Sequence, residues 1–327
     1  MIAGGVVAAG AALVVGAVIG GGFTPADPRI DEGSGMVVSL SHADTVWIVN
    51  DSGDAARLFA VDTTDGHTRA VVTLSGATNV DWEALAISPD GGVPHLWVGD
   101  VGDNDAVRPS IQVYRLAEPD LVTGSTDAWT GYDFVYPDGP HDAETLLVDP
   151  RTDRLYVVTK GLLGGSVYEA PEVLRSDATN QLTRIGSAPL VVTDGAFRSD
   201  GSVVLRNYLN GFLRPSVTGP DQKFGLPRQR QGETLAVLPG DDTAYVGSEG
   251  AGTPVRLVTL PSLSSAPPSN SPTPGSGTET ASGAPDATTG TGPGPWVLAI
   301  GLAVVAVVLG LVGGVRRRRG QPRRSIT

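Results

Sequence analysis

The sequence contains no cysteine and only two lysines, Lys160 and Lys223. Without cysteine the chain has neither a disulfide framework nor a thiolate metal site, and four histidines make zinc or copper centres a poor fit. All 35 acidic residues precede Trp296, whereas six of the 23 basic residues follow it, which leaves 17 against 35 before that point. This part of the chain would repel nucleic acid and anionic lipid, and would attract cations or basic partners.

Residues 295–315 predict a transmembrane helix. From Trp296 to Val315 the chain has twenty residues without a charge, enough to span about 30 Å of hydrocarbon. A buried core helix is the alternative, but the uniform apolarity and the arginines at 316–319 argue against it. Because arginine-rich flanks stay in the cytoplasm, we expect a single-pass protein of the cell membrane. Its basic tail, residues 316–327, would be cytoplasmic and its folded domain extracellular.

Residues 1–24 predict a signal peptide or an N-terminal membrane segment. The first 22 residues are uncharged and apolar, as the central region of a secretory signal is, but they lack its usual basic start. Either the start codon is placed too late, or the segment remains as a second membrane span. Residues 262–294 are rich in Pro, Ser, Thr and Gly and predict a stalk without a packed core. The folded domain is therefore expected over residues 25–261.

An internal repeat is the most informative feature of this domain. Five times an acidic residue opens a short apolar strand, a turn follows, and a second strand comes next with a large apolar residue near its start. The acids are Glu32, Glu83, Glu144, Asp194 and Glu233, and the second strands include TVWIVND, HLWVGD, RLYVVTK, SVVLRNY and TAYVGSE. Their spacings of 51, 61, 50 and 39 residues suit propeller blades of roughly 40–50 residues. One or two further strand-like runs follow each pair.

These patterns predict an all-β fold, a β-propeller with five blades. Six blades remain possible if the insertion near 105–108 hides another, and a β-sandwich is the structural alternative. The fifth copy lacks its outer strand, so we expect the stretch around Phe23–Ile30, bracketed by Pro25 and Pro28, to supply it. Trp47 and Trp97 lie mid-strand at equivalent positions and are expected to pack between blades.

The repeat predicts an acidic ring at one mouth of the central channel. Inner strands would begin, and second strands end, at this mouth, so Glu32, Glu83, Glu144, Asp194 and Glu233 should converge there. Candidate ligand-binding residues at the second-strand ends and adjacent turns are Asn50, Asp51, Asp100, Asp103, Asn104, His141, Asp142, Asn207 and Glu249, with Asp81 beside them.

Carboxylates about 6 Å apart repel by roughly 3 kcal/mol at an effective dielectric near 20. Protons, a cation or a basic ligand must therefore relieve the ring. Ca²⁺ fits best because it takes six to eight oxygen ligands. Two simpler interpretations stay open: each acid could accept backbone N–H bonds from the next blade, and the NDSGD and GDVGDN loops could be ordinary Asx turns.

The stretches NDSGD, WEALAI, LWVGDVGDN and IQVYRLAEP, within residues 28–260, resemble exported bacterial β-propeller proteins. In architecture they are similar to phytase-like and SMP-30/gluconolactonase-like propellers. That resemblance implies divalent cations held by acids at the channel mouth. This chain departs from those families in two respects. The enzymes usually have six blades, and the chain has few basic residues that could hold phosphate.

Two functions follow from these observations. The first is a non-enzymatic surface module that binds a cation, a cationic ligand or a surface protein at the acidic mouth. It is favoured because no G-x-S-x-G elbow, zinc-protease helix or phosphate loop occurs. The second is a calcium-dependent hydrolase of esters, lactones or glycosides that uses the same acids.

Overall fold

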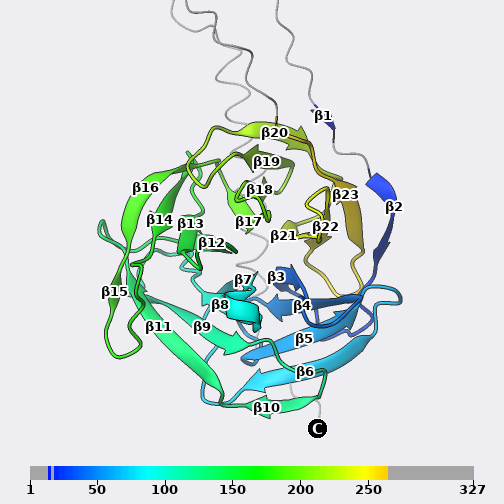
Figure 1. The fold of residues 1–327 in the computed structure, drawn as a ribbon, viewed down its shortest axis with the longest axis horizontal. Helices are drawn as coiled ribbons and strands as arrows, with labels where there is room; N and C mark the ends of the chain where they lie inside the picture. The colour runs from blue at the N-terminus through cyan, green and yellow to red at the C-terminus, as the bar shows by residue number, and fades with distance from the viewer. Residues whose placement is uncertain (1–13, 16–17, 264–327) are drawn as a thin grey trace, which may run out of the picture. The chain divides into compact units, whose positions relative to one another are not determined.

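The computed structural model describes residues 14–15 and 18–263, which form five β-sheets arranged around a central axis (Figure 1). The expected five-bladed β-propeller is thereby confirmed, and the insertion near 105–108 is a loop. From the axis outwards, blade one contains β3 (Gly33–Val38), β4 (Thr45–Asn50), β5 (Arg57–Asp62) and β6 (Thr68–Leu74). Blade two contains β7 (Trp82–Ser88), β8 (His95–Asp100), β9 (Ile111–Ala117) and β11 (Trp129–Val135).

The other three blades repeat this order. Blade three contains β12 (Ala143–Val148), β13 (Leu155–Thr159), β14 (Gly165–Glu169) and β16 (Thr183–Ala188). Blade four contains β17 (Val192–Phe197), β18 (Val203–Asn207), β19 (Asn210–Arg214) and β20 (Gln222–Gly225). Blade five contains β21 (Gly232–Val237), β22 (Thr243–Ser248), β23 (Val255–Thr259) and β2 (Val18–Phe23). A 3-10 turn at Asp90–Gly92 joins β7 to β8.

The N-terminal strand β2 closes the propeller by pairing antiparallel with β23, with Phe23 opposite Val255. The closing strand is thus taken from the N-terminal side, as expected, but it ends where the expected stretch begins. Pro25 and Pro28 fall in the connection to β3, since proline cannot donate to a strand ladder. Phe23 packs edge-on against Tyr245 with ring centroids 5.4 Å apart. The strand begins before residue 25 and overlaps the segment for which the sequence predicts export.

Three blades carry an additional outer strand that the sequence did not predict. The strands are β10 (Gly124–Thr126), β15 (Asn180–Gln181) and β1 (Val14–Val15), and they pair in parallel with β6, β11 and β20 respectively. β10 and β15 belong to loops of the following blade. They cover backbone groups that an outermost strand would otherwise leave open for pairing with another chain.

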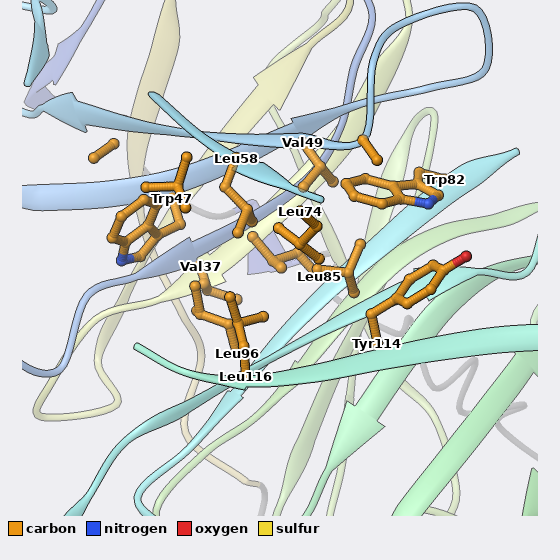
Figure 2. Packing of buried hydrophobic residues seen from close by; sticks show 14 of the residues in the cluster. Val37, Trp47, Val49, Leu58, Leu74, Trp82, Leu85, Leu96, Tyr114 and Leu116 are labelled. Atoms are coloured by element: carbon orange, nitrogen blue, oxygen red, sulfur yellow. The ribbon is translucent and has the colours of Figure 1, made fainter. Parts of the chain in front are cut away.

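The hydrophobic core lies between neighbouring blades. Figure 2 shows the cluster shared by blades one and two, in which Trp47, Leu58 and Trp82 are fully buried. Each indole N–H is satisfied: Trp47 Nε1 donates to Glu118 at 2.8 Å and Trp82 Nε1 to the Thr78 carbonyl at 3.0 Å. Trp97 is buried between blades two and three. The expected packing role of Trp47 and Trp97 is confirmed.

The membrane predictions fall largely outside the described part of the chain. Across residues 14–15 and 18–263, no helix is long and apolar enough to cross a bilayer. The expected transmembrane helix at 295–315, the basic tail at 316–327 and the stalk from residue 264 onward lie outside the described residues. So do residues 1–13 and 16–17 of the expected signal segment.

Candidate functional site

Each inner strand carries a β-bulge at its second residue. The register between inner and second strand shifts at this residue in all five blades, and the bulged residues are Ser34, Glu83, Glu144, Thr193 and Glu233. A bulge leaves one residue unpaired and re-aims its side chain. The second strands end opposite these positions. We call this end of the central channel the channel mouth, and it is where the sequence placed the convergent acids.

Three of the bulges present a buried glutamate. Glu83, Glu144 and Glu233 are each at most 4% exposed, and they interact electrostatically although they come from blades two, three and five. Their carboxyls therefore face the central channel. Burial, followed by repulsion from Glu144 and Asp51, raises the pKa of Glu83 well above its usual value. Burial likewise raises the pKa of Glu144 and of Glu233.

The bulges of blades one and four carry hydroxyls instead of carboxyls. Ser34 Oγ donates a 2.7 Å hydrogen bond to the carbonyl of Trp82, and Thr193 Oγ1 donates a 3.0 Å bond to the carbonyl of Gly232. Trp82 and Gly232 are the first residues of the inner strands in blades two and five. Both hydroxyls thus join their own blade to the next one at the same position.

The structure corrects the expected ring at two positions. Glu32 precedes the bulge of blade one by two residues and is exposed, so the buried ring has no carboxyl from this blade's bulge. Asp194 follows the bulge of blade four and accepts N–H bonds from Leu235 at 2.5 Å and from Gly195 at 2.7 Å. Asp194 therefore accepts a backbone N–H bond from the next blade, which is one of the simpler interpretations left open by the sequence. Its pKa is raised, chiefly by burial.

Two basic side chains lie on the side of the mouth formed by blades three and four. Lys160 Nζ pairs with Glu144 and lies 5.6 Å from the ring centroid of Tyr208. Burial lowers the pKa of Lys160, but attraction to Glu144 outweighs it and the pKa rises well above its usual value. The fully buried Arg206 donates to the carbonyls of Thr234 and Gly247. Burial lowers its pKa to about 10.

Three carboxylates gather between blades one and two. Asp51 follows β4, Asp81 precedes β7, and Glu83 is the bulged residue of β7. One carboxylate oxygen from each lies within 4.8 Å of the others, and these side chains belong to residues that are 8%, 8% and 4% exposed. Asn79 Nδ2 donates to the carbonyl of Asp51 at 2.9 Å, while Asn79 Oδ1 accepts from the N–H of Trp82 at 3.0 Å. This asparagine fixes the distance between the two loops.

Gly102 packs directly against these carboxylates. Its N–H donates to the carbonyl of Asp81 at 3.1 Å. A Cβ at this position would lie 2.5 Å from Asp81 Oδ2 and 2.7 Å from Glu83 Cγ. Glycine is therefore required by this close approach, and the loop after β8 forms a wall of the three-carboxylate cluster.

Asp100 at the end of β8 and Asp142, which directly precedes β12 of blade three, hold that loop in place. Asp100 accepts N–H bonds from Val80 and Asp81 and pairs with Arg108 at 2.8 Å. Asp142 Oδ1 accepts the N–H of Asp103 at 2.9 Å, and burial raises the pKa of Asp142. These contacts agree with the turn interpretation of the GDVGDN loop, whose Asn104 is exposed.

The other expected ligand-binding residues divide between turns and the mouth. Asn50 Nδ2 donates to the Arg29 carbonyl at 2.6 Å, and Asn207 Oδ1 accepts the N–H of Leu209 at 3.0 Å, so both organise turns. His141 contacts Asp138 and Tyr168 at 3.0 and 2.9 Å. Glu249 does line the mouth, because its carboxyl shares a hydrogen bond with Glu233.

Tyr208 and Gln231 belong to the site and were missed by sequence reasoning. Tyr208 Oη donates to Glu233 Oε1 at 3.4 Å and Gln231 Nε2 donates to the same oxygen at 3.1 Å. Tyr208 is the residue directly after a second strand, and this position is the sequence signal that could have identified it.

Compared with known proteins, the chain matches no protein-family model and no curated protein sequence.

Proposed function

We propose that the channel mouth binds a divalent cation, Ca²⁺, through Asp51, Asp81 and Glu83. The main support is that one carboxylate oxygen from each of these three residues lies within 4.8 Å of the other two, and that the residues are largely buried. At 4.8 Å two ionised carboxylates repel by about 3.5 kcal/mol at an effective dielectric near 20. A cation between them would turn this repulsion into attraction. Calcium accepts such oxygen ligands, and water or carbonyl oxygens can complete its coordination.

The test is a calcium titration followed by thermal melting of the full chain in detergent. Saturation at 100 times the Kd would add about 2.7 kcal/mol of stability, or several degrees at about 2–4 °C per kcal/mol. Glu83→Gln and Asp81→Asn should abolish the shift. Glu172→Gln is the matched control, because that side chain is 86% exposed in a loop away from the mouth. A shift that survives in both mouth variants would place calcium elsewhere and refute the site.

We further propose that the propeller is an exported domain held at the cell membrane by residues 295–315. Support comes from the uncharged twenty-residue run and the arginines that follow it. Alkaline extraction of membranes tests this proposal. The full chain should stay in the membrane fraction, while a chain ending at residue 294 should be released. Release of both chains would refute the anchor.

A hydrolase is the second candidate, favoured by the unequal carboxyls of Glu233 and Glu249. Glu233 is buried, Glu249 is half-buried, and the two share a hydrogen bond beside Tyr208. A protonated and an ionised carboxyl side by side can act as general acid and base. The resemblance to gluconolactonase-like propellers supports the same candidate. The test is a screen of esters, lactones and glycosides with the wild type and Glu233→Gln. Turnover unaffected by Glu233→Gln would exclude this pair.

A further inference from the structure

Four exposed leucines lie on three adjoining loops at the channel-mouth end of the propeller. Leu162 and Leu163 lie between β13 and β14, Leu190 between β16 and β17, and Leu209 between β18 and β19. They are 62%, 102%, 49% and 70% exposed. All three loops join strands at the end of the propeller where the inner strands begin. We call these residues the leucine patch.

Hydrogen bonds tie the three loops of the leucine patch together. Val191 N–H donates to the Gly161 carbonyl at 3.0 Å, and Asn207 Nδ2 donates to the Leu190 carbonyl at 3.2 Å. Asn207 Oδ1 in turn accepts the N–H of Leu209 at 3.0 Å. The leucines are therefore held on one surface of blades three and four. An apolar side chain exposed singly is ordinary, whereas several on adjoining loops favour an interaction surface.

The leucine patch borders the acidic mouth directly. Leu162 follows Lys160 by two residues, and Leu209 follows Tyr208. Lys160 pairs with Glu144, Tyr208 bonds to Glu233, and Glu233 shares a hydrogen bond with Glu249. The carboxyls of the mouth therefore contact residues that lie at most two positions from a leucine of the patch. The complementary surface combines a large apolar group with a cation, and an anionic lipid surface would be repelled.

The described chain leaves the propeller away from this surface. Leu260 N–H donates to the Asp242 carbonyl at 2.8 Å, and Gln222 Nε2 donates to the Ser262 carbonyl at 2.9 Å. Asp242 lies in the turn between β21 and β22, at the end of the inner strands opposite the mouth. Residues 260–263 therefore lie at the face opposite the leucine patch.

We infer that the leucine patch and the acidic mouth together bind a partner protein, through a segment in which Lys or Arg is flanked by large apolar residues. The apolar residues pack on Leu163 and Leu209, and the basic residue points to the carboxyls of Glu233 and Glu249. Charge complementarity between the basic residue and the acidic mouth speeds association and selects the partner, while the apolar contact slows dissociation. The inference rests on the proposed function in one respect, that the mouth is the binding site.

The experiment selects displayed short random peptides on the full chain in detergent. Enriched peptides should contain Lys or Arg next to Leu, Ile, Phe or Met, and their binding should weaken as ionic strength rises. A double variant, Leu163→Ser with Leu209→Ser, should bind a synthesised enriched peptide at least about tenfold more weakly, about 1.4 kcal/mol. The matched control is Val122→Ser with Val173→Ser, since these valines are 70% and 77% exposed in loops at the opposite face.

Several results would overturn the inference. These are no enrichment, enriched peptides without a basic residue, equal binding by the leucine and valine variants, or binding to phosphatidylglycerol vesicles through the leucines. Melting curves of all variants, with and without calcium, show that each is folded and separate the two proposals. A calcium-dependent rise in Tm without peptide binding would refute only the peptide-binding surface. Peptide binding without a calcium-dependent rise in Tm would refute only the calcium site.

Discussion

Replacing Glu83 by glutamine should stabilise the metal-free protein at neutral pH. At pH 7 the folded state must keep the Glu83 carboxyl ionised beside Asp51 and Asp81 or bind a proton. One ionised pair at 4.8 Å already costs about 3.5 kcal/mol at an effective dielectric near 20. Protonating a carboxyl of ordinary pKa 4.5 at pH 7 costs about 3.4 kcal/mol, at 1.36 kcal/mol for each pH unit. Binding a proton therefore sets an upper limit of about 3.4 kcal/mol on the folding free energy that Glu83 costs at pH 7.

The pH dependence follows from the direction of the pKa shift. Because the pKa of Glu83 is raised by folding, the folded protein binds this proton more tightly than the unfolded chain does. This contribution to stability is fully present below pH 4.5 and is lost as the pH rises from 4.5 through the folded pKa. Glutamine carries no such loss. The stability gained by Glu83→Gln should thus grow from near zero at pH 4.5 to about 1–3 kcal/mol at pH 7.

The assay is thermal melting of the full chain in detergent and a calcium chelator, at both pH values. The expected gain at pH 7 corresponds to a rise in Tm of several degrees, at about 2–4 °C per kcal/mol. Glu172→Gln should leave the melting temperature unchanged at both values. The carboxyls of Asp27 and Asp62 do not interfere, because their pKa values are lowered to about 2 and their stabilisation persists above the unfolded value of 3.8. A lower Tm for Glu83→Gln at pH 7 would refute the reasoning, since it would show an ionised, well-satisfied carboxylate.

Three further predictions concern the packing around the mouth and the closure of the propeller. Gly102→Ala should weaken calcium binding at least about tenfold, or 1.4 kcal/mol, because its Cβ would displace Asp81 and Glu83; an unchanged titration would contradict this. Thr193→Val should lower the stability by about 1–2 kcal/mol in denaturant unfolding, since the buried Gly232 carbonyl loses its 3.0 Å bond, and a loss below about 0.3 kcal/mol would mean that this hydroxyl does not join the blades. Deleting residues 1–23 removes β2 and should lower the Tm far more than deleting residues 1–13, whereas equal melting temperatures would show that β2 does not close the propeller.

Much of the propeller could be read from local sequence signals. A strand of alternating or wholly apolar residues, a turn of Asp and Gly and a second strand recur five times, and each pair is an antiparallel hairpin in the structure. Even the weak runs GFLRPSV and QKFGL of blade four form β19 and β20. Hairpins form between neighbours in sequence, so their signals lie within a few residues of one another.

Part of the expected acidic ring could be predicted from strand direction. Glu83, Glu144 and Glu233 lie together because each stands near the start of an inner strand, and all inner strands begin at the same mouth. Glu32 and Asp194 do not occupy the bulged positions of their strands, which could not be predicted because bulges follow from contacts between strands. Asp81 was only a neighbour of the expected site, because its approach to Asp51 depends on two loops from different blades.

The sequence by itself determined the repeated hairpins and the concentration of acids at one end, and it favoured five blades, because these depend on local patterns of apolar, acidic and turn-forming residues. Only the tertiary structure decided which acids are buried together, which acid accepts backbone N–H bonds from the next blade, and which N-terminal segment closes the propeller. Each of these depends on packing between segments distant in sequence, where a shift of one residue exchanges the side chain that faces the channel for its neighbour.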